Sequence, residues 1–423
     1  MSFRALALAL GAALALLLAP QTLAASARPL TLTQALASAL AANPRLTAAE
    51  RDIGMAGGRR LQADALPNPN LSLDVENVAG TTSYQGLDLA ETTLQISQLV
   101  ELGGKREARI AATSAGASVA RWEREAIRLQ VFAETTAAFI AVLSAQRRLD
   151  VLQAQVDAIE RLAPLLQTRV QAGASSAAEV SRARVASDLA RVDLEKAKGL
   201  LATARRELAL LMGLPEAKFG PATGNLHKVN APPPLQSLLR DAQGNPQLTR
   251  FTAIKAQRSA ELSGAHAKAV PDVTLGVGYR HYSETADSGM VFSLSVPLPV
   301  FDQNQGNILE ARESLRRAEA EEAIARSALI SQLGRAYDTL KAAHAEIGLL
   351  RASTIPGARN AFEGIETGYS EGRYTLLELL DAQSILTDTA LRELDALVAF
   401  HTALATLEGL TGRPVSFSKG KTK

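Results

Sequence analysis

Acidic residues follow two glycine-containing segments at matching places in the chain. Glu179 lies shortly after Gly173. Glu378 lies at the same spacing after Gly372, and Asp381 follows one helical turn later. Glycine readily adopts the positive φ angles of tight turns between helices. Carboxylates beside such turns attract cations when several copies meet at a pore. Acidic residues also occur at helix N-termini because they offset the helix macrodipole, and both interpretations stay open.

The chain offers little other chemistry. Metal sites need several ligands within reach of one another. The histidines are scattered, with no pair at ligand spacing on one helix face: His227, His266, His281, His344 and His401. No serine, histidine and acid form a recognisable catalytic motif. We therefore expect no enzyme, no cofactor and no metal site.

The N-terminus has the pattern of a secretory signal peptide. Arg4 precedes an apolar run over residues 5–19, which is too short to span a bilayer as a helix. Small residues at 22–24 or 25–27 offer a cleavage site. We expect an exported chain, and an uncleaved membrane anchor is the alternative. The absence of cysteine excludes disulfides and lipidation through cysteine. The net charge of +2, without a basic block, gives no sign of nucleic-acid binding.

The chain is internally duplicated at a spacing of about 200 residues. Asn43-Pro44 corresponds to Asn245-Pro246, and the segment 69–73 corresponds to 271–275. The glycine turns and the acids after them also correspond. The fold must therefore be one in which a single repeat cannot bury its apolar surface alone.

Alanine-rich segments with apolar residues at heptad spacing predict long helices. From Val180 to Leu211 the pattern steps by three and four, broken by one polar residue. Long helices are predicted over 104–171, roughly 100 Å in length, and over 306–369. Shorter helices are predicted beside them at 32–65, 176–212, 234–269 and 375–411. A second apolar stripe on these helices favours a ring of helices, although ordinary bundle packing remains the alternative.

Two segments alternate apolar and polar residues as half-exposed strands do. The first hairpin is predicted within 70–100 and the second within 271–300. No segment after the leader reaches 18 consecutive apolar residues, so a membrane would have to be crossed by strands. Four strands cannot close a barrel, and open edges are not tolerated in lipid, so several chains would share one. A half-buried sheet in a soluble protein is the alternative.

These patterns divide the chain into five parts. The predicted boundaries are 1–27 for the signal peptide, 28–212 for repeat 1, 213–234 for an equatorial linker, 235–412 for repeat 2 and 413–423 for a C-terminal tail.

The motifs at the helix turns resemble those of the TolC family of outer-membrane efflux proteins. The residues that carry the resemblance are 172–173 with 179–180 and 368–372 with 378–382. The segment 98–110, Gln-Leu-Val-Glu-Leu-Gly-Gly-Lys-Arg-Glu-Ala-Arg-Ile, is most similar to the branch serving cobalt, zinc and cadmium efflux. The resemblance implies a mixed, mainly α fold, with a long α-helical barrel continuous with a transmembrane β-barrel. Each chain would give four strands, and a trimer would have 12.

The resemblance also implies a function. The chain would form a homotrimeric passive exit duct in the outer membrane, with its helical barrel in the periplasm. Its partners would be outer-membrane lipid, a periplasmic adaptor and an inner-membrane resistance-nodulation-division transporter driven by protons. The cargo would be divalent heavy-metal cations. Export of organic drugs or secreted polypeptides by the same architecture is one alternative, and a soluble periplasmic coiled-coil scaffold is another.

Family positions map onto the helix turns of this sequence. The resemblance assigns Glu378 and Asp381 to an acidic ring at the periplasmic gate, and Glu179 and Tyr369 to the gate network. Arg373 would neutralise these acids. The family's gate arginine aligns with Tyr374, the residue directly after it. The helix tip of repeat 1 is the expected adaptor contact, and the tip of repeat 2 is the expected moving gate. The turn residues are Gly173, Ala174 and Ser175 at the first tip and Gly372 at the second.

Overall fold

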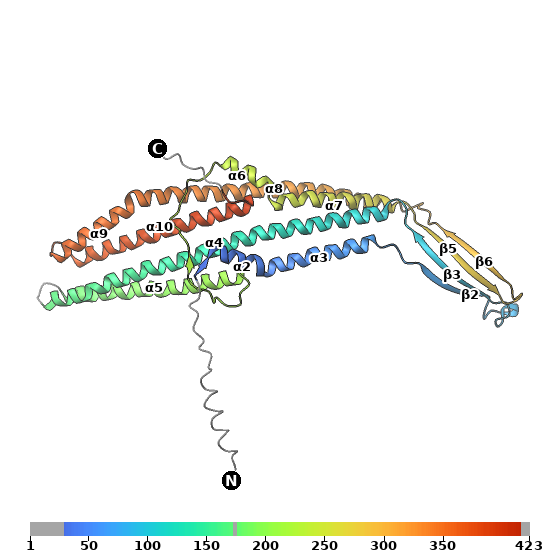
Figure 1. The fold of residues 1–423 in the computed structure, drawn as a ribbon, viewed down its shortest axis with the longest axis horizontal. Helices are drawn as coiled ribbons and strands as arrows, with labels where there is room; N and C mark the ends of the chain where they lie inside the picture. Colours follow the sequence, from blue (N-terminus) through green and yellow to red (C-terminus); the bar gives the residue numbers. More distant parts are fainter. Residues whose placement is uncertain (1–28, 172–175, 416–423) are drawn as a thin grey trace, which may run out of the picture. The chain divides into compact units, whose positions relative to one another are not determined.

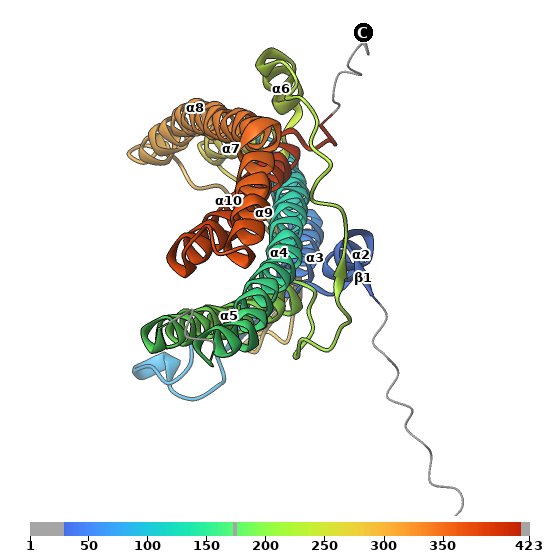
Figure 2. The same ribbon diagram turned by 90° about the vertical axis from the view of Figure 1, so that its left-hand side faces the viewer.

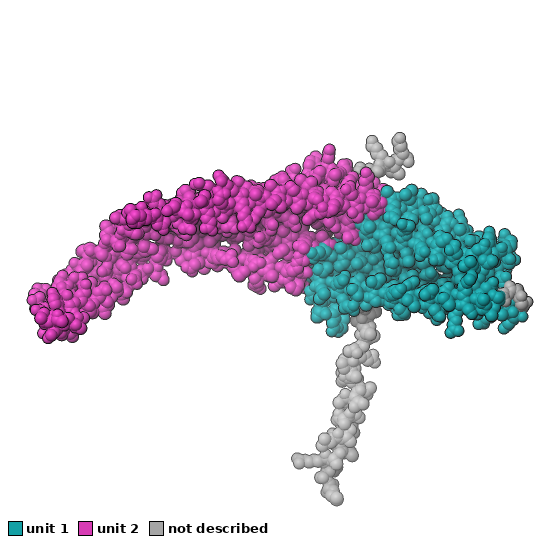
Figure 3. Space-filling view, turned by 180° about the vertical axis from the view of Figure 1, so that it is seen from behind, with its two compact units in different colours: residues 1–41, 134–229, 345–401 teal, residues 42–133, 230–344, 402–423 magenta. Residues whose placement is uncertain are grey.

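The computed structural model describes residues 29–171 and 176–415 (Figure 1). The predicted signal peptide, the turn residues Gly173, Ala174 and Ser175, and the tail from residue 416 onward lie outside the described residues. Contacts divide the chain into two compact units (Figure 3). Unit 1 comprises 1–41, 134–229 and 345–401, and unit 2 comprises 42–133, 230–344 and 402–423. Each unit takes residues from both predicted repeats.

Unit 2 contains the β-sheet, which has the strand order β2-β3-β5-β6 with every neighbouring pair antiparallel. Its strands are β2 (Asn70–Glu76), β3 (Glu91–Val100), β5 (Val273–Tyr282) and β6 (Ser288–Ser295). The prediction of two hairpins is confirmed, and the β3–β5 pairing joins them. Strand β6 ends before the predicted limit at residue 300. Pro297 and Pro299 follow, and they have no N–H to donate to a ladder.

The register places apolar side chains in rows across one face of the sheet. One row runs Leu71, Ile96, Val277 and Phe292 from strand to strand. Phe292 is 79% exposed and Leu71 is 68% exposed, so none of the described residues covers this face. The intervening positions form a polar face, where Arg280 donates to Thr93 Oγ1 at 2.8 Å and pairs with Glu91. The sheet is thus apolar on one side and polar on the other.

The helices of unit 2 lead into and out of the strands. They are α3 (Pro44–Asp64), the first part of α4 (Lys105–Gln171), α6 (Leu235–Asp241), α7 (Pro246–Lys268) and most of α8 (Gln305–Leu349). The predicted unbroken helices 32–65 and 234–269 are wrong. Each is interrupted before a proline, because the Asn43 and Asn245 side chains accept N–H groups of a new helix.

Unit 1 consists mainly of two helical hairpins (Figure 2). In one, the second part of α4 packs along α5 (Ala177–Leu211); in the other, α9 (Ile355–Ser370) runs beside α10 (Leu376–Thr411). Unit 1 also holds most of α2 (Leu32–Ala42) and the short parallel pair β1 (Leu30–Thr31) and β4 (Ala222–Thr223). The predicted heptad stripe of α5 is buried: Ala183, Ser187, Ala190, Leu194, Ala197, Ala204 and Leu208.

The two predicted long helices differ. Helix α4 runs for 67 residues without a break, through Pro164. The second gives way to a π-helical turn at Leu350–Thr354, directly before Ile355 and Pro356, and continues as α9. A proline removes one helical hydrogen bond and crowds the preceding turn, which favours such a distortion.

Among the described residues, α4 also passes a length and composition test for a membrane helix. One 18-residue window has a mean hydropathy of 1.5, and 39% of that window is buried. The sequence criterion of 18 consecutive apolar residues did not detect it. By itself this is weak evidence for a span, because the core helix of a soluble protein passes the same test.

Candidate functional site at the helix tips

The turn between α9 and α10 is a compact glycine-terminated helix end. Gly372 has φ +80°, and its N–H donates to the Tyr369 carbonyl at 3.0 Å. The next N–H, of Arg373, donates to the Gly368 carbonyl at 2.8 Å. These two bonds form a Schellman motif, which satisfies carbonyls that the helix end leaves free. The turn therefore reverses the chain with little exposed backbone.

Glu378 caps the start of α10. Its carboxylate accepts hydrogen bonds from the Thr375 backbone N–H at 2.7 Å and from the Thr375 hydroxyl at 2.8 Å. The Glu378 N–H donates in turn to the Thr375 hydroxyl oxygen at 3.3 Å, which completes a capping box. The bonds from the Thr375 backbone and hydroxyl hold the pKa of Glu378 below its usual range. The carboxylate is therefore charged and fixed.

The first tip repeats part of this pattern. Ser176 is the N-cap of α5, and its hydroxyl oxygen accepts the Glu179 N–H at 3.3 Å. The sequence motif is Ser or Thr followed three residues later by Glu, a recognised signal for a helix start. Sequence reasoning found the two glutamates but not Ser176 and Thr375, although this motif would have identified both.

Tyr369 links the two tips within unit 1. Its side chain is 3% exposed, and the Arg169 guanidinium of α4 lies 4.9 Å from the ring centroid. Arg169 also donates to the Tyr369 carbonyl at 3.0 Å. Burial raises the pKa of Tyr369, and its hydroxyl has no hydrogen-bond partner among the described residues. Sequence reasoning missed Arg169, whose position in the last turn of α4 suits a cation.

Apolar packing holds the tips together around this tyrosine. Leu166 and Tyr369 are buried with residues from both helical hairpins, and the rest of the cluster is Ala183, Leu376 and Leu379. The two tips of unit 1 are therefore joined by one close-packed apolar cluster.

The remaining predicted residues lie on the surface of the second tip. Within the single chain, Arg373 pairs with Glu371 through its Nε at 2.6 Å, and its pairing with the acids of α10 stays a prediction. Asp381 is exposed on α10, one turn beyond Glu378. The Tyr374 ring lies over Gly368. Glu378 and Asp381 thus both lie exposed on the second tip, and in the described part of the chain no group of three histidines or acids could hold a metal.

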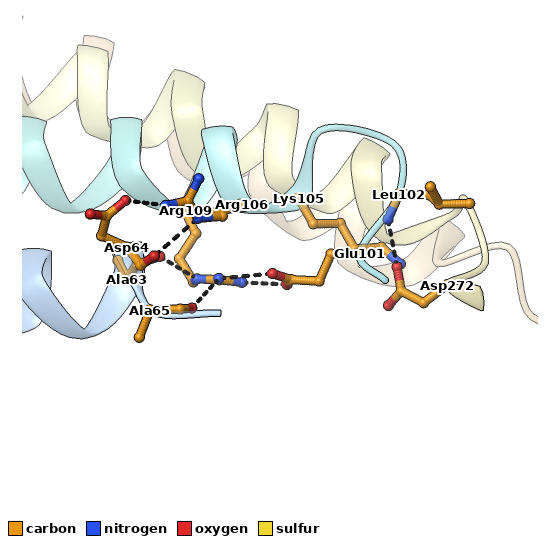
Figure 4. Close-up of polar contacts among 9 residues, drawn as sticks. All are labelled: Ala63, Asp64, Ala65, Glu101, Leu102, Lys105, Arg106, Arg109 and Asp272. Carbon is orange, nitrogen blue, oxygen red and sulfur yellow. Dashed lines mark hydrogen bonds and ion pairs between the residues drawn. The ribbon is translucent and has the colours of Figure 1, made fainter. Parts of the chain in front are cut away.

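The segment 98–110 forms the junction between strand β3 and helix α4 (Figure 4). Arg109 makes a bidentate ion pair with Glu101, at 2.6 and 3.0 Å. The same guanidinium donates from Nε to the Ala63 carbonyl at 2.9 Å, at the end of α3. Arg106 likewise binds Asp64 at 2.6 Å. The basic residues of this motif thus fasten α4 to the end of α3.

A third ion pair connects the same junction to repeat 2. Lys105 Nζ lies 2.6 Å from Asp272 Oδ1, which also accepts the Leu102 N–H at 2.9 Å. Gly103, with φ +71°, packs so closely on Val270 that a Cβ would lie 2.8 Å from the Val270 Cβ. Glycine is required here for both conformation and space. Sequence reasoning used this motif only as a mark of resemblance, and the structure shows its mechanical role.

The charges at this junction are stable against protonation. The Arg109 hydrogen bond lowers the pKa of Glu101 despite partial burial. Burial alone would raise the pKa of Asp272, but the Lys105 and Leu102 N–H bonds outweigh it and lower that pKa. A cavity of about 680 Å³ lies beside the pairs. Its lining has four basic and four acidic residues, so it selects neither sign of charge: Lys105, Arg109, Arg258, Lys268, Glu101, Glu261, Asp272 and Glu310.

Comparison with known proteins agrees with this architecture. The family described as "Outer membrane efflux protein" matches residues 35–214 and 239–413. The cobalt-zinc-cadmium resistance protein CzcC of Cupriavidus metallidurans is 31% identical over 388 residues, 92% of this chain and 91% of that protein. The nickel and cobalt resistance protein CnrC of the same organism is 27% identical, over 76% of this chain and 78% of that protein.

A solved structure shows the same fold. The crystal structure of CusC superposes with a TM-score of 0.75 at 18% sequence identity, covering 92% of this chain and 93% of that one. The predicted fold class is thereby confirmed, namely a mainly helical channel with a helical barrel and a β-barrel part. The expectation that the chain is no enzyme agrees with the description of the matching family as an efflux protein. The chain belongs to the outer membrane efflux protein family.

Proposed function

We propose that three copies of this chain form the outer-membrane channel of a tripartite efflux pump for divalent heavy-metal cations. The observation that carries the proposal is the 31% identity to a cobalt-zinc-cadmium resistance protein along nearly the whole chain. A periplasmic adaptor would connect the channel to an inner-membrane transporter driven by protons, and the channel itself would be passive.

The sheet supports a barrel built from several chains. Its apolar face is exposed, as a lipid-facing surface must be, and its polar face carries Arg280 and Glu91. Strands β2 and β6 are the outer strands of the sheet. Since lipid cannot satisfy an unpaired strand edge, β6 of one copy would pair with β2 of the next. Three copies would close 12 strands.

The acids at the helix tips support passage of cations. Glu378 is held charged by its cap, and Asp381 is exposed one turn further along α10. Three copies of these residues around a narrow entrance would form a ring of negative charge, which attracts cations and repels anions. We assign to Tyr369, Arg169 and Glu179 the coupling between the two tips, and to the first tip the contact with the adaptor.

Deletion and complementation test the substrate. Cells lacking the gene should lose tolerance to cobalt, zinc or cadmium, and the intact gene should restore it. A variant in which Glu378 and Asp381 are both alanine should still insert into the outer membrane and assemble into a trimer. The proposed cargo is wrong if deletion leaves tolerance to these metals and to nickel and copper unchanged while sensitising cells to dyes or detergents. That second result would favour export of organic compounds by the same architecture.

A further inference from the structure

The contact between the two repeats within one chain has a specific geometry. The segment leaving β3 lies against the segment entering β5, with Lys105 bound to Asp272 and Gly103 packed on Val270. The Leu102 N–H also donates to the Asp272 side chain. Both segments lie at the same end of the sheet, because β3 ends at Val100 opposite Val273, where β5 begins.

The corresponding segments at the two edges of the sheet bind other neighbours in the described chain: Asn304 donates to the Ala265 carbonyl at 2.6 Å, and the Pro67 carbonyl accepts from Gln98 Nε2 at 2.9 Å. The segment leaving β6 precedes α8, and the segment entering β2 follows α3. Strands β6 and β2 lie at opposite edges of the four-stranded sheet. Because strand directions alternate along the order β2-β3-β5-β6, a following copy's β2 would continue the alternation beside β6. The end of β6 would then meet the start of that β2.

The duplication identifies which residues correspond. Helix α4 begins at Lys105 and helix α8 at Gln305, which aligns these two residues. Before the strands, Pro69 corresponds to Pro271, so Asn70 corresponds to Asp272. The ion pair between repeats therefore has an amide pair, Gln305 with Asn70, as its counterpart between copies. Two amides are complementary in hydrogen bonding, since each has a donor and an acceptor.

The second charged pair of the junction also has an uncharged counterpart. By the same alignment of helix starts, Glu101 corresponds to Phe301 and Arg109 to Leu309. Phe301 is 91% exposed and Leu309 is 56% exposed in the single chain. On the segment before β2, Leu66 is 69% exposed. Large apolar side chains thus lie uncovered on both segments that the closed ring would bring together, and their burial would favour association.

We propose that Phe301–Gln305 of one copy docks on Leu66–Asn70 of the next copy, at the position that corresponds to the contact between the two repeats. The proposal rests on the proposed function, because it needs a barrel shared between chains. Gln305 binds Asn70 where Lys105 binds Asp272, and Phe301 covers the Leu66 side chain. A second copy, and not lipid, therefore covers the exposed side chains of Phe301 and Leu66. The interface is heterologous and closes a ring.

Cysteine cross-linking tests the contact in a chain that has no cysteine of its own. Gly103 and Val270 lie so close that a Cβ on residue 103 would be 2.8 Å from the Val270 Cβ. Gln303 already carries a Cβ, so the corresponding contact between copies must be wider, as disulfides require with β-carbons about 3.5–4.5 Å apart. By the alignment of the two repeats, Gln303 corresponds to Gly103 and Asn68 corresponds to Val270. The double variant Q303C with N68C, oxidised in native membranes, should give covalent trimers on a non-reducing gel. Neither single variant should do so, because each cysteine meets its partner only on the neighbouring copy.

Two further variants sharpen the result. The matched control combines N68C with A286C, which lies in the turn between β5 and β6 at the far end of the strands, and it should give no cross-link. The pair Q305K with N70D installs the ion pair found inside the chain. It should raise the temperature at which the trimer dissociates in detergent, and each single substitution should not.

The outcomes separate the two proposals. A monomeric native chain in mild detergent would refute the shared barrel and the contact together. A trimer in which neither Q303C nor D302C cross-links to N68C would be consistent with the shared barrel but would overturn this contact. Quenching of F301W fluorescence by brominated lipids in reconstituted vesicles would also overturn it, because Phe301 would then face lipid.

Discussion

The ring of Tyr374 lies directly over Gly368, so that a Cβ on residue 368 would come within 2.4 Å of the Tyr374 Cδ2. The carbonyl of the same glycine accepts the Arg373 N–H that closes the helix turn. Gly368 therefore fixes both the backbone of the turn and the position of an aromatic side chain. The second tip depends on the absence of a single methyl group.

Gly368→Ala should displace the Tyr374 ring and loosen the second tip. We expect a loss of stability of about 0.5–3 kcal/mol, as for other substitutions that create a steric clash, and a higher resting conductance in planar bilayers. Gly364→Ala, in the same helix, is the matched control because a Cβ there meets nothing within 4 Å. It should be neutral or slightly stabilising, since alanine favours helix. Equal effects of the two substitutions would refute the role of Gly368.

Replacement of both Glu378 and Asp381 by alanine should raise single-channel conductance and weaken block by multivalent cations. The reason is the loss of like charges that gather at the entrance in the trimer. Because Glu378 also caps α10, Thr375→Ala serves as the control: it removes the hydroxyl of the capping box and leaves both charges. Unchanged cation block in the double variant would show that these acids serve only as helix caps.

Gly103→Ala should destabilise the chain more than Gly104→Ala. Both glycines have positive φ, at +71° and +77°, so each substitution carries a conformational cost of about 1–2 kcal/mol. Only residue 103 adds a clash, with Val270 and with the Ala267 carbonyl. Thermal unfolding of the two variants in detergent measures the difference. Equal midpoints would mean that the close packing on Val270 contributes nothing.

The junction should weaken only in strong acid. Because the folded-state pKa of Glu101 is lowered by Arg109, the unfolded chain binds the proton more readily. The stability from this pair is present above the unfolded carboxyl pKa, about 4.3, and is lost as pH falls through the lowered folded value. Glu101→Gln should cost about 1–3 kcal/mol at pH 7 and reduce the pH dependence below pH 4.

The exposed pair of Arg124 and Glu50 supplies a control for that experiment. Its side chains are 37% and 58% exposed, and exposed pairs contribute about 0–1 kcal/mol. Glu50→Gln should therefore leave the unfolding midpoint nearly unchanged, both at pH 7 and below pH 4. A similar loss in both variants would argue against a special role for the junction.

Much of the fold could be predicted because its determinants are local. The stripe through Ala183 and Leu194 specifies a packed helix, and the alternation through Leu71 and Leu73 specifies a strand with one apolar face. The helix breaks at Asn43 and Asn245 were missed, although each asparagine before proline is a local start signal. The site was harder to predict, because Arg169 and Tyr369 come together only through tertiary packing.

The pairing of β3 with β5 also has a consequence for folding. It joins residues from distant parts of the chain, Val100 with Val273. During export the first hairpin therefore emerges long before its central partner strand, with an apolar face and an unpaired edge in an aqueous compartment. Such surfaces favour aggregation. For an exported chain we therefore expect that periplasmic holdases protect the first hairpin until β5 has been translocated.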